Sequence, residues 1–207
     1  VANLEIARRA LIHSDEEFRH QTAQFLHDRV QSDLMVVAMK LKSVQEAVDV
    51  DTSKTIGLAI HRLESIRGSD LRNLIELLAP NFMSSGLEES VKNLVKQYVS
   101  DLKVTLVIDA QAVLPRLNDE FMLGIYRIVE QALLNVVTHG PATEVNIILA
   151  MQPKGIIYLE VTDNGPGSRN SKPGVGSSII DSWVGILNGK KEIATSPGNG
   201  YSISISF

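Results

Sequence analysis

Residues 130–139 read Glu-Gln-Ala-Leu-Leu-Asn-Val-Val-Thr-His, and residues 163–167 read Asp-Asn-Gly-Pro-Gly. Gln131, Asn135 and His139 recur every four residues, so a helix carries their side chains on one face. The second stretch is a glycine-rich turn that follows a strand-like run. Together they predict a polar helix face and a carboxylate on a tight turn, a combination that suits a metal–nucleotide complex.

The residue types in these two stretches agree with that chemistry. The side-chain oxygen of Asn135 can bind Mg²⁺, a hard cation that prefers oxygen ligands. The carboxylate of Asp163 can accept a hydrogen bond from the amino group of adenine. Gly165 and Gly167 let the backbone pass close to a ligand without a side chain in the way. We therefore predict a site for an adenine nucleotide and Mg²⁺.

Residues 81–207 mix helical patterns with runs of alternating apolar residues, which are typical of strands. The expected helices are Leu87–Leu102, Asn118–His139 and Ser177–Leu187. The expected strands are Lys103–Asp109, Glu144–Met151, Gly155–Thr162, Lys191–Ser196 and Tyr201–Phe207. This mixture predicts a two-layer α/β sandwich that contains the nucleotide site.

The first eighty residues look wholly helical. A seam of apolar residues at steps of four and three runs along the first helix: Leu26, Val30, Leu34, Val37, Leu41 and Val44. A second helix carries Ile56, Ile60, Leu63, Leu71, Leu74 and Leu78. Asp49–Ser53 interrupts the helical pattern between them, and Asp51 to Ser53 offer N-caps for the second helix. The pattern predicts a helical hairpin.

One helical hairpin has too little core to be stable alone, so two of them should pair into a four-helix bundle. We therefore expect a homodimer through residues 1–80. Pro80–Gly86 is a cluster of helix breakers and marks the expected boundary with a second domain, residues 81–207. The expected fold class is α+β, with a dimerising helical hairpin followed by a two-layer sandwich.

The composition of the 207 residues, 44% hydrophobic and 21% charged, is that of a soluble globular protein. A net charge of −4 gives no basic surface for nucleic acid. The absence of cysteine excludes disulfides and thiolate metal sites and permits a reducing compartment. No apolar run approaches the ~18–20 residues of a membrane span, so we expect a cytoplasmic location without membrane contact. The chain starts at Val1 rather than Met, which is compatible with a fragment whose anchor or sensor lies upstream.

Further short motifs accompany the two stretches that open this section. In chain order they are Leu26-His27-Asp28, Leu71-Arg72-Asn73-Leu74-Ile75, Gly86-Leu87-Glu88-Glu89-Ser90-Val91, Tyr126-Arg127-Ile128-Val129 and Gly198-Asn199-Gly200-Tyr201. The ordered set resembles the transmitter region of bacterial two-component sensor histidine kinases over nearly the whole chain. More narrowly, it resembles the short-lidded subfamily with a Leu-His-Asp phosphoacceptor motif, whose partner regulators have helix-turn-helix outputs. The second half resembles the ATP-binding module of gyrase, mismatch-repair and heat-shock chaperone ATPases.

This resemblance implies roles for individual residues. His27 would be the phosphoacceptor, and Asp28 would hold its ring tautomer and remove its proton. His27 follows a seam residue, so it should lie beside the apolar stripe and reach solvent. Asn135 would bind Mg²⁺, and Asp163 would recognise adenine. The implied nucleotide-binding residues are Gln131, Asn135, His139, Asp163, Gly165, Gly167, Gly174, Gly176 and Ser177, with Ser168–Pro173 as a short lid.

The chain departs from the subfamily pattern at three positions. Gln131 stands where a Glu is usual, and Glu130 cannot replace it because one residue turns a side chain by ~100° around a helix. An amide cannot remove a proton from water, so ATP hydrolysis should be poor. Ser32 stands where a Gln is usual for dephosphorylating the partner regulator, and Ser177 stands where the second glycine box usually continues with Leu.

Three functions remain compatible with the sequence. The first is an ATP-dependent protein histidine kinase that phosphorylates His27 and passes the phosphoryl group to a response regulator receiver domain. The second is a pseudokinase that acts as a dimeric signalling scaffold, which Gln131 and Ser177 favour. The third is a protein-serine kinase of the anti-sigma type, against which the Leu26-His27-Asp28 hairpin argues.

Overall fold

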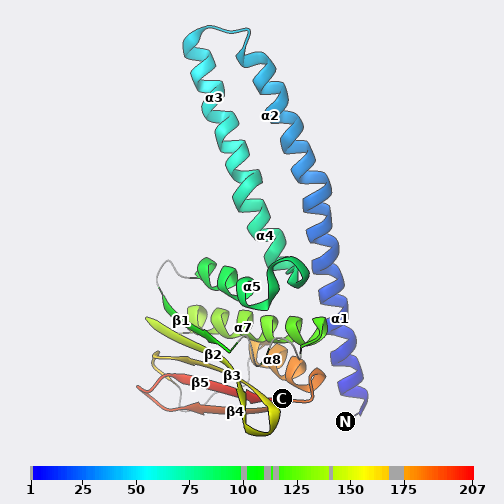
Figure 1. The fold of residues 1–207 in the computed structure, drawn as a ribbon, viewed down its shortest axis with the longest axis vertical. Helices are drawn as coiled ribbons and strands as arrows, with labels where there is room; N and C mark the ends of the chain where they lie inside the picture. The colour runs from blue at the N-terminus through cyan, green and yellow to red at the C-terminus, as the bar shows by residue number, and fades with distance from the viewer. Residues whose placement is uncertain (1, 99–101, 110–112, 114–116, 140–141, 168–174) are drawn as a thin grey trace. The chain divides into compact units, whose positions relative to one another are not determined.

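The computed structural model describes residues 2–98, 102–109, 113, 117–139, 142–167 and 175–207. It divides into two compact units: Leu11–Pro80, and Asn81–Phe207 together with Val1–Ala10. The first unit is helical, and the second combines helices with a five-stranded sheet (Figure 1). This architecture confirms the predicted fold class, a helical hairpin followed by a mixed α/β unit.

Each arm of the hairpin contains one π-helical turn between two α-helical segments. The first arm comprises α1 (Ala2–Phe25), η1 (Leu26–Val30) and α2 (Gln31–Gln45). The second comprises α3 (Val50–Ser65), η2 (Ile66–Asp70) and α4 (Leu71–Leu78). Figure 1 shows α2 and α3 lying side by side after the chain reverses between them. The helical hairpin was predicted, but its two π-turns were not.

The N-cap of α3 differs from the prediction. Asp49 has an extended backbone conformation and caps the helix, two to four residues before the expected Asp51 to Ser53. Its Oδ1 accepts hydrogen bonds from the backbone N–H groups of Asp51 and Thr52, both at 3.1 Å. The hydroxyl of Thr52 donates to Oδ2 at 2.7 Å. Asp49 is better placed because its side chain satisfies two N–H groups that the first helical turn leaves free.

The apolar seam of the first arm is only partly used within one chain. Leu34 and Leu41 are half-buried, whereas Val37 and Val44 remain 46% and 49% exposed. Ala38 is buried in place of Val37. The single hairpin therefore leaves part of its apolar surface uncovered.

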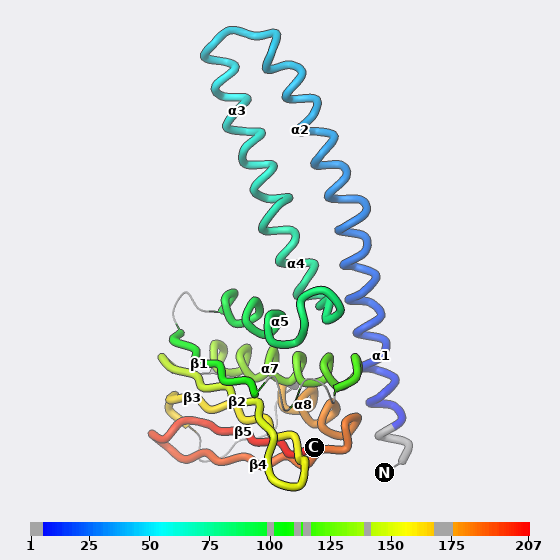
Figure 2. Tube along the Cα trace, viewed as in Figure 1, coloured from blue at the N-terminus to red at the C-terminus, as the bar shows by residue number. Residues whose placement is uncertain are grey.

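The sheet of the second unit has the order β1-β2-β3-β5-β4, which Figure 2 traces from one edge to the other. Its strands are β1 (Lys103–Ile108), β2 (Glu144–Gln152), β3 (Ile156–Asp163), β4 (Lys190–Thr195) and β5 (Tyr201–Ser206). The first pair is parallel and the other three pairs are antiparallel. A 3₁₀ turn, η4 (Pro153–Gly155), joins β2 to β3.

Three helices form one layer against this sheet: α5 (Phe82–Tyr98), α7 (Asp119–His139) and α8 (Val175–Ile186). Figure 1 shows α7 between the other two. The core between the layers consists of alternate strand residues and the inner faces of these helices; its most buried members include Leu94, Tyr126, Leu133, Ile147, Leu149, Leu159 and Ile205. Burial of large apolar side chains is the main stabilising contribution here.

Two boundaries of α5 differ from the prediction. The helix begins at Phe82, inside the segment expected to break helices, and the break falls at Gly86, whose φ of 72° and ψ of 167° interrupt the helix. The helix ends at Tyr98, and Leu102 lies outside it. Gly86 supplies the break because glycine adopts a positive φ without steric cost.

The apolar character of α7 corrects one sequence-based expectation. Among the described residues, Asp119–Thr138 is long and apolar enough to cross a membrane by length and composition. Half of that window is buried inside the fold, where the helix covers the sheet. The apolar side chains of α7 therefore serve the core of this unit.

Candidate functional site

The first group of candidate residues lies on η1. The His27 side chain is 64% exposed, and its Nδ1 lies 2.9 Å from Oδ1 of Asp28. A carboxylate accepts only, so this contact places the proton of a neutral imidazole on Nδ1. The lone pair is then on Nε2, which makes this nitrogen the nucleophile. The expected exposure of His27 is confirmed, and Asp28 is positioned to hold the tautomer.

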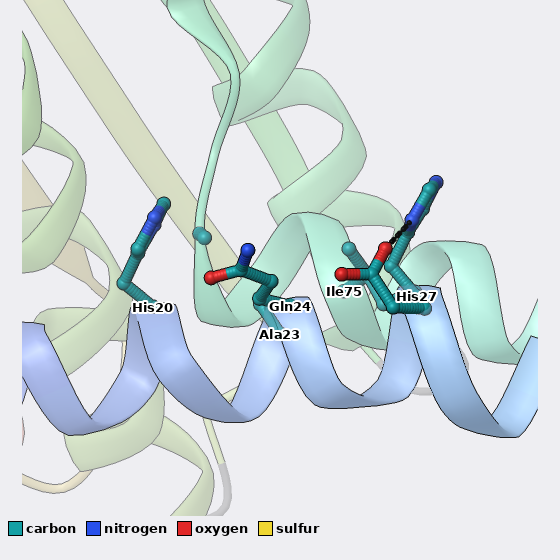
Figure 3. Close-up of a pocket in the computed structure, with 7 residues that line it drawn as sticks. His20, Ala23, Gln24, His27 and Ile75 are labelled. Carbon is teal, nitrogen blue, oxygen red and sulfur yellow. Dashed lines mark hydrogen bonds and ion pairs between the residues drawn. The ribbon is translucent and has the colours of Figure 1, made fainter.

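Two shallow hollows of the helical unit meet at this histidine. The first, of about 300 Å³, is lined by His20, Ala23, Gln24, His27, Asp28, Ile75 and Ala79. Figure 3 shows His20, Gln24 and His27 projecting from the same side of the first arm. The second, of about 250 Å³, is lined by His27, Asp28, Gln31, Ser32, Met35 and Arg67. The His27 ring is therefore open to solvent and borders both hollows.

The second group of candidate residues lies on α7. Gln131 and Asn135 are half-buried, and Nε2 of Gln131 donates to Oδ1 of Asn135 at 3.1 Å. The spacing of four residues predicted that the two side chains share a face, and their contact confirms it. The hydrogen bond also uses the Asn135 oxygen that we expect to bind Mg²⁺. His139 ends the helix.

Glu130 points to a different neighbour. One of its carboxylate oxygens lies 3.2 Å from Nη1 of Arg127, whose side chain is only 2% exposed. The guanidinium of Arg127 in turn lies over the ring of Tyr126, 5.4 Å from its centroid. Glu130 is therefore engaged in a buried ion pair away from Gln131, as the one-residue step around the helix predicted.

Gly176, on the first turn of α8, approaches the amide face of α7 closely. A Cβ atom at Gly176 would lie 2.5 Å from both Oδ1 of Asn135 and Nε2 of Gln131. Any larger side chain here would displace at least one of the two amides. Ser177 follows on the same helical turn and is half-buried. The second glycine box and the Asn135 face therefore belong to one site, although Gly174 and the lid Ser168–Pro173 lie outside the described residues.

The glycine turn after β3 is built around Asp163. Oδ1 of Asp163 accepts a hydrogen bond from the backbone N–H of Gly165 at 2.7 Å, which leaves Oδ2 available for a ligand. Asn164 fixes the other side of the turn, because its Oδ1 accepts from the backbone N–H groups of Thr143 and Glu144 at 2.8 and 3.0 Å. The turn is therefore held at both sides before any ligand binds.

The β4–β5 hairpin packs against this turn. The backbone N–H of Gly198 donates to the carbonyl of Pro166 at 2.7 Å. Gly200 has a φ of 72°, and a Cβ atom on it would lie 1.9 Å from the carbonyl oxygen of Asp163. Gly167 has a φ of 60°, and a Cβ atom on it would likewise clash with the carbonyl oxygen of Ser196. Glycines are thus required on both sides of the contact.

Tyr201 lies directly opposite Asp163 in the strand register. Burial raises the pKa of the Tyr201 phenol, and the carboxylates of Asp181 and Asp163 raise that pKa further. The phenol therefore stays protonated at neutral pH and remains a hydrogen-bond donor near the Asp163 turn. Asp181 itself is paired with Lys191.

These residues fit a nucleotide and its metal. Gly176 and Gly165 supply backbone cradles that a Cβ atom would fill, Asn135 supplies an amide oxygen and Asp163 a free carboxylate oxygen. Hard oxygen donors suit Mg²⁺, and a carboxylate suits an exocyclic amino group. Among the described residues no cluster of three or more acidic or histidine side chains forms a separate metal site.

No protein-family model matches the chain. The sensor histidine kinase LiaS of Bacillus subtilis is 27% identical over an alignment of 198 residues, which covers 91% of this chain and 53% of LiaS. A sensor-like histidine kinase of Chloroflexus aurantiacus is 22% identical over an alignment of 222 residues, 99% of this chain and 36% of the relative. The chain is similar to sensor histidine kinases. It spans about half of the length of the first relative and about a third of the second.

A solved histidine kinase domain has the same fold. The domain from the blue-light activated histidine kinase EL346 of Erythrobacter litoralis matches with a TM-score of 0.54 and 15% identity, and the match covers 85% of this chain and 94% of that domain. At this identity the likeness concerns the fold. Histidine kinases are thus both the sequence relatives and the structural neighbour of this chain.

Sequence reasoning gave no role to three residues that this histidine kinase-like fold places at the sites, although Gly200 was part of the quoted Gly198-Asn199-Gly200-Tyr201 motif. Asn164 and Gly200 hold the Asp163 turn, and Arg67 lines a hollow with His27. Asn164 was part of the quoted turn, and its preference for turn positions was an available signal. Arg67 gave no signal, because its position near His27 depends on how the two arms of the hairpin pack.

Proposed function

We propose that the protein is an ATP-dependent histidine kinase that phosphorylates His27 and passes the phosphoryl group to an aspartate on a response regulator receiver domain. The observation that carries this proposal is the exposed His27 ring with its Nδ1 at Asp28. The similarity to sensor histidine kinases supports it independently. We further propose that residues 1–80 form the dimerisation and phosphotransfer domain and residues 81–207 the ATP-binding domain, acting in the cytoplasm.

The phosphoryl transfer follows from the tautomer of His27. The lone pair on Nε2 attacks the γ-phosphorus of ATP; the Nε2–P bond forms as the bond to the bridging oxygen breaks, and ADP leaves. Asp28 holds the Nδ1 proton and can take it as positive charge develops on the ring. No water is activated in this step, so the lack of a base at Gln131 affects it less than ATP hydrolysis.

The nucleotide would be held by the second unit. Asn135 would bind Mg²⁺, which neutralises phosphate charge when bound. The free oxygen of Asp163 would accept from the adenine amino group, and the first turn of α8 at Gly176 and Ser177 would face the phosphates, since helix N-termini favour anions. Gly165 and Gly167 would allow close backbone approach, and we include Gly174 and His139 in the proposed nucleotide site on their sequence positions alone.

We propose a homodimer because one hairpin leaves an apolar surface uncovered. Leu11, Phe18 and Phe25 follow one another at steps of seven and are 71%, 69% and 60% exposed. A heptad of exposed apolar residues is the pattern of a helix that packs in a bundle. Phe18→Glu with Phe25→Glu should yield monomers in sedimentation, whereas Met83→Glu, which changes an even more exposed apolar residue of the other unit, should leave dimers. Monomeric wild-type protein would contradict this assembly.

The second candidate function is a dimeric scaffold without transferase activity. It is favoured by the hydrogen bond from Gln131 to Asn135, which uses the oxygen expected to bind the metal. A serine kinase of the anti-sigma type is less favoured, because it gives no role to an exposed histidine–aspartate pair on a helical hairpin.

One labelling experiment distinguishes the three functions. The protein is incubated with γ-labelled ATP and Mg²⁺ beside His27→Ala, Asn135→Ala and His20→Ala. We expect an acid-labile, base-stable label that is lost in the first two variants and kept in His20→Ala, whose histidine lines the same hollow. Nucleotide binding without label supports the scaffold. Acid-stable label that survives His27→Ala indicates serine phosphorylation and refutes the proposal.

A further inference from the structure

The two π-helical turns of the hairpin bring a cation to the phosphoacceptor candidate. His27 lies on η1 of the first arm and Arg67 on η2 of the second. Both side chains line one hollow of about 250 Å³, together with Asp28, Gln31, Ser32 and Met35. A π-turn inside a helix is uncommon and is frequent at functional sites. Two of them, one in each arm of the hairpin, supply the His27 and Arg67 side chains of this hollow.

Arg67 carries an unsatisfied hydrogen-bond donor. Within the part of the chain that the structure describes, its Nε is the one buried side-chain nitrogen or oxygen without a hydrogen-bond partner. A buried N–H group without a partner costs free energy and calls for an explanation. The only acid among the lining residues is Asp28, which is engaged with Nδ1 of His27.

The charges around the hollow indicate what Arg67 can receive. Asp28 is the only anion that lines it, and Arg67 is the only permanent cation. A phosphoryl group attached to Nε2 of His27 brings nearly two negative charges close to Asp28 at neutral pH. Without a cation nearby, that product is destabilised by repulsion between like charges. The planar guanidinium of arginine matches the geometry of phosphate oxygens.

We propose that Arg67 receives the phosphoryl group of phosphorylated His27 and stabilises it as a dianion. The inference rests on the proposed function, in that His27 must be the residue phosphorylated. Arg67 is a positioning residue for the product: it does not supply the proton or the nucleophile. Two consequences follow. The second pKa of the phosphoryl group is lowered, and loss of the phosphoryl group to water is slowed.

The test uses phosphoramidate, which phosphorylates histidine without ATP. Nε2 of His27 attacks its phosphorus, the Nε2–P bond forms as the P–N bond breaks, and ammonia leaves; the Nδ1 proton then passes to Asp28 and on to solvent, which leaves a neutral ring. ³¹P NMR of the full chain follows the product through pH, and His27→Ala identifies the His27 resonance among those of other histidines. The variants are Arg67→Ala and Arg67→Lys, with Arg62→Ala as the control arginine on the same arm.

We expect the pKa of phosphorylated His27 to rise by about one unit in Arg67→Ala, because an opposite charge has been removed. The phosphoryl group on His27 should also be lost to water several-fold faster at neutral pH in this variant. Arg67→Lys should be intermediate, since a point charge replaces the planar fork, and Arg62→Ala should match the wild type. Circular dichroism verifies that each variant is folded, and the lysine variant keeps the apolar stem.

The assignment is overturned if folded Arg67→Ala has the wild-type phosphoryl pKa and the wild-type phosphohistidine lifetime. It is also overturned if Arg62→Ala changes both quantities as much as Arg67→Ala does. The kinase proposal is tested separately, because the phosphoramidate reaction does not use the ATP site. If Arg67→Ala shows the expected changes with phosphoramidate but ATP gives no label, the kinase proposal is refuted and the Arg67 proposal stands. If ATP labels His27 but Arg67→Ala behaves like the wild type, the Arg67 proposal is refuted and the kinase proposal stands.

Discussion

Gly176→Ala tests whether the second glycine box and the Asn135 face form one nucleotide site. The new Cβ atom would lie 2.5 Å from Oδ1 of Asn135 and 2.5 Å from Nε2 of Gln131. Both distances are well below ordinary van der Waals contact, so at least one amide must turn away. Because Gln131 and Asn135 are hydrogen-bonded to each other, moving one disturbs the other.

The expected change in the free energy of unfolding follows from two opposing effects. Alanine gains about 1 kcal/mol over glycine in a helix, and overpacking costs roughly 1–3 kcal/mol, so the free energy of unfolding changes by at most about 2 kcal/mol. Nucleotide affinity should suffer more than stability, since the Asn135 oxygen is the expected metal ligand. Displacing it should weaken Mg-ATP binding by at least about tenfold, which corresponds to ~1.4 kcal/mol.

Gly185→Ala is the matched control, because it changes the same residue type on the same helix. A Cβ atom at Gly185 meets nothing within 4 Å. We expect wild-type Mg-ATP affinity by calorimetry and a free energy of unfolding raised by up to about 1 kcal/mol. The reasoning is refuted if folded Gly176→Ala binds Mg-ATP as tightly as the wild type, or if Gly185→Ala loses affinity equally.

Three further substitutions test single contacts. Gln131→Glu removes the donor to Asn135 and supplies a base, so phosphate release from ATP should rise by about tenfold or more in a steady-state assay. Asp163→Asn keeps an oxygen for the Gly165 N–H but turns an NH₂ group toward adenine; ATP binding should weaken by about tenfold while sedimentation is unchanged. Hydrogen bonds from Thr52, above all from its hydroxyl, lower the pKa of Asp49 below its usual value of 3.8. The ionised Asp49 cap therefore stabilises the fold above pH 3.8, and this stabilisation is lost as the pH falls through the lowered pKa. In Asp49→Asn this acid-dependent part of the melting temperature should disappear.

The spacing of apolar and polar residues predicted the helices and strands, because this spacing reflects which side of one helix or strand faces the core. The period of two in β2 and β3 is the alternation of residues that face the helix layer. The four-residue spacing on α7 predicted the contact between Gln131 and Asn135, since neighbouring helical turns bring such pairs together. Both inferences needed only residues within one element.

Features that depend on packing between elements were not predictable in this way. The cap at Asp49 was missed because several polar residues in Asp49–Ser53 can cap a helix, and residue type alone does not decide between them. The π-turns have no side-chain pattern by which the sequence analysis could find them. Arg67 lies in such a turn, and its proximity to His27 exists only in the folded hairpin.

The choice between kinase and scaffold depends on one atom, Oδ1 of Asn135. In this structure it accepts a hydrogen bond from Gln131 at 3.1 Å. A neutral hydrogen bond contributes only about 0.5–1.5 kcal/mol net, so a dication with phosphate ligands can displace it. The bond therefore weakens metal binding without preventing it, and the absent base at Gln131 penalises hydrolysis by water rather than attack by an imidazole. The missing base reduces ATP hydrolysis more than transfer to His27, and the hydrogen bond lowers metal affinity for both reactions alike, which is why we favour a kinase with low hydrolytic activity over a scaffold.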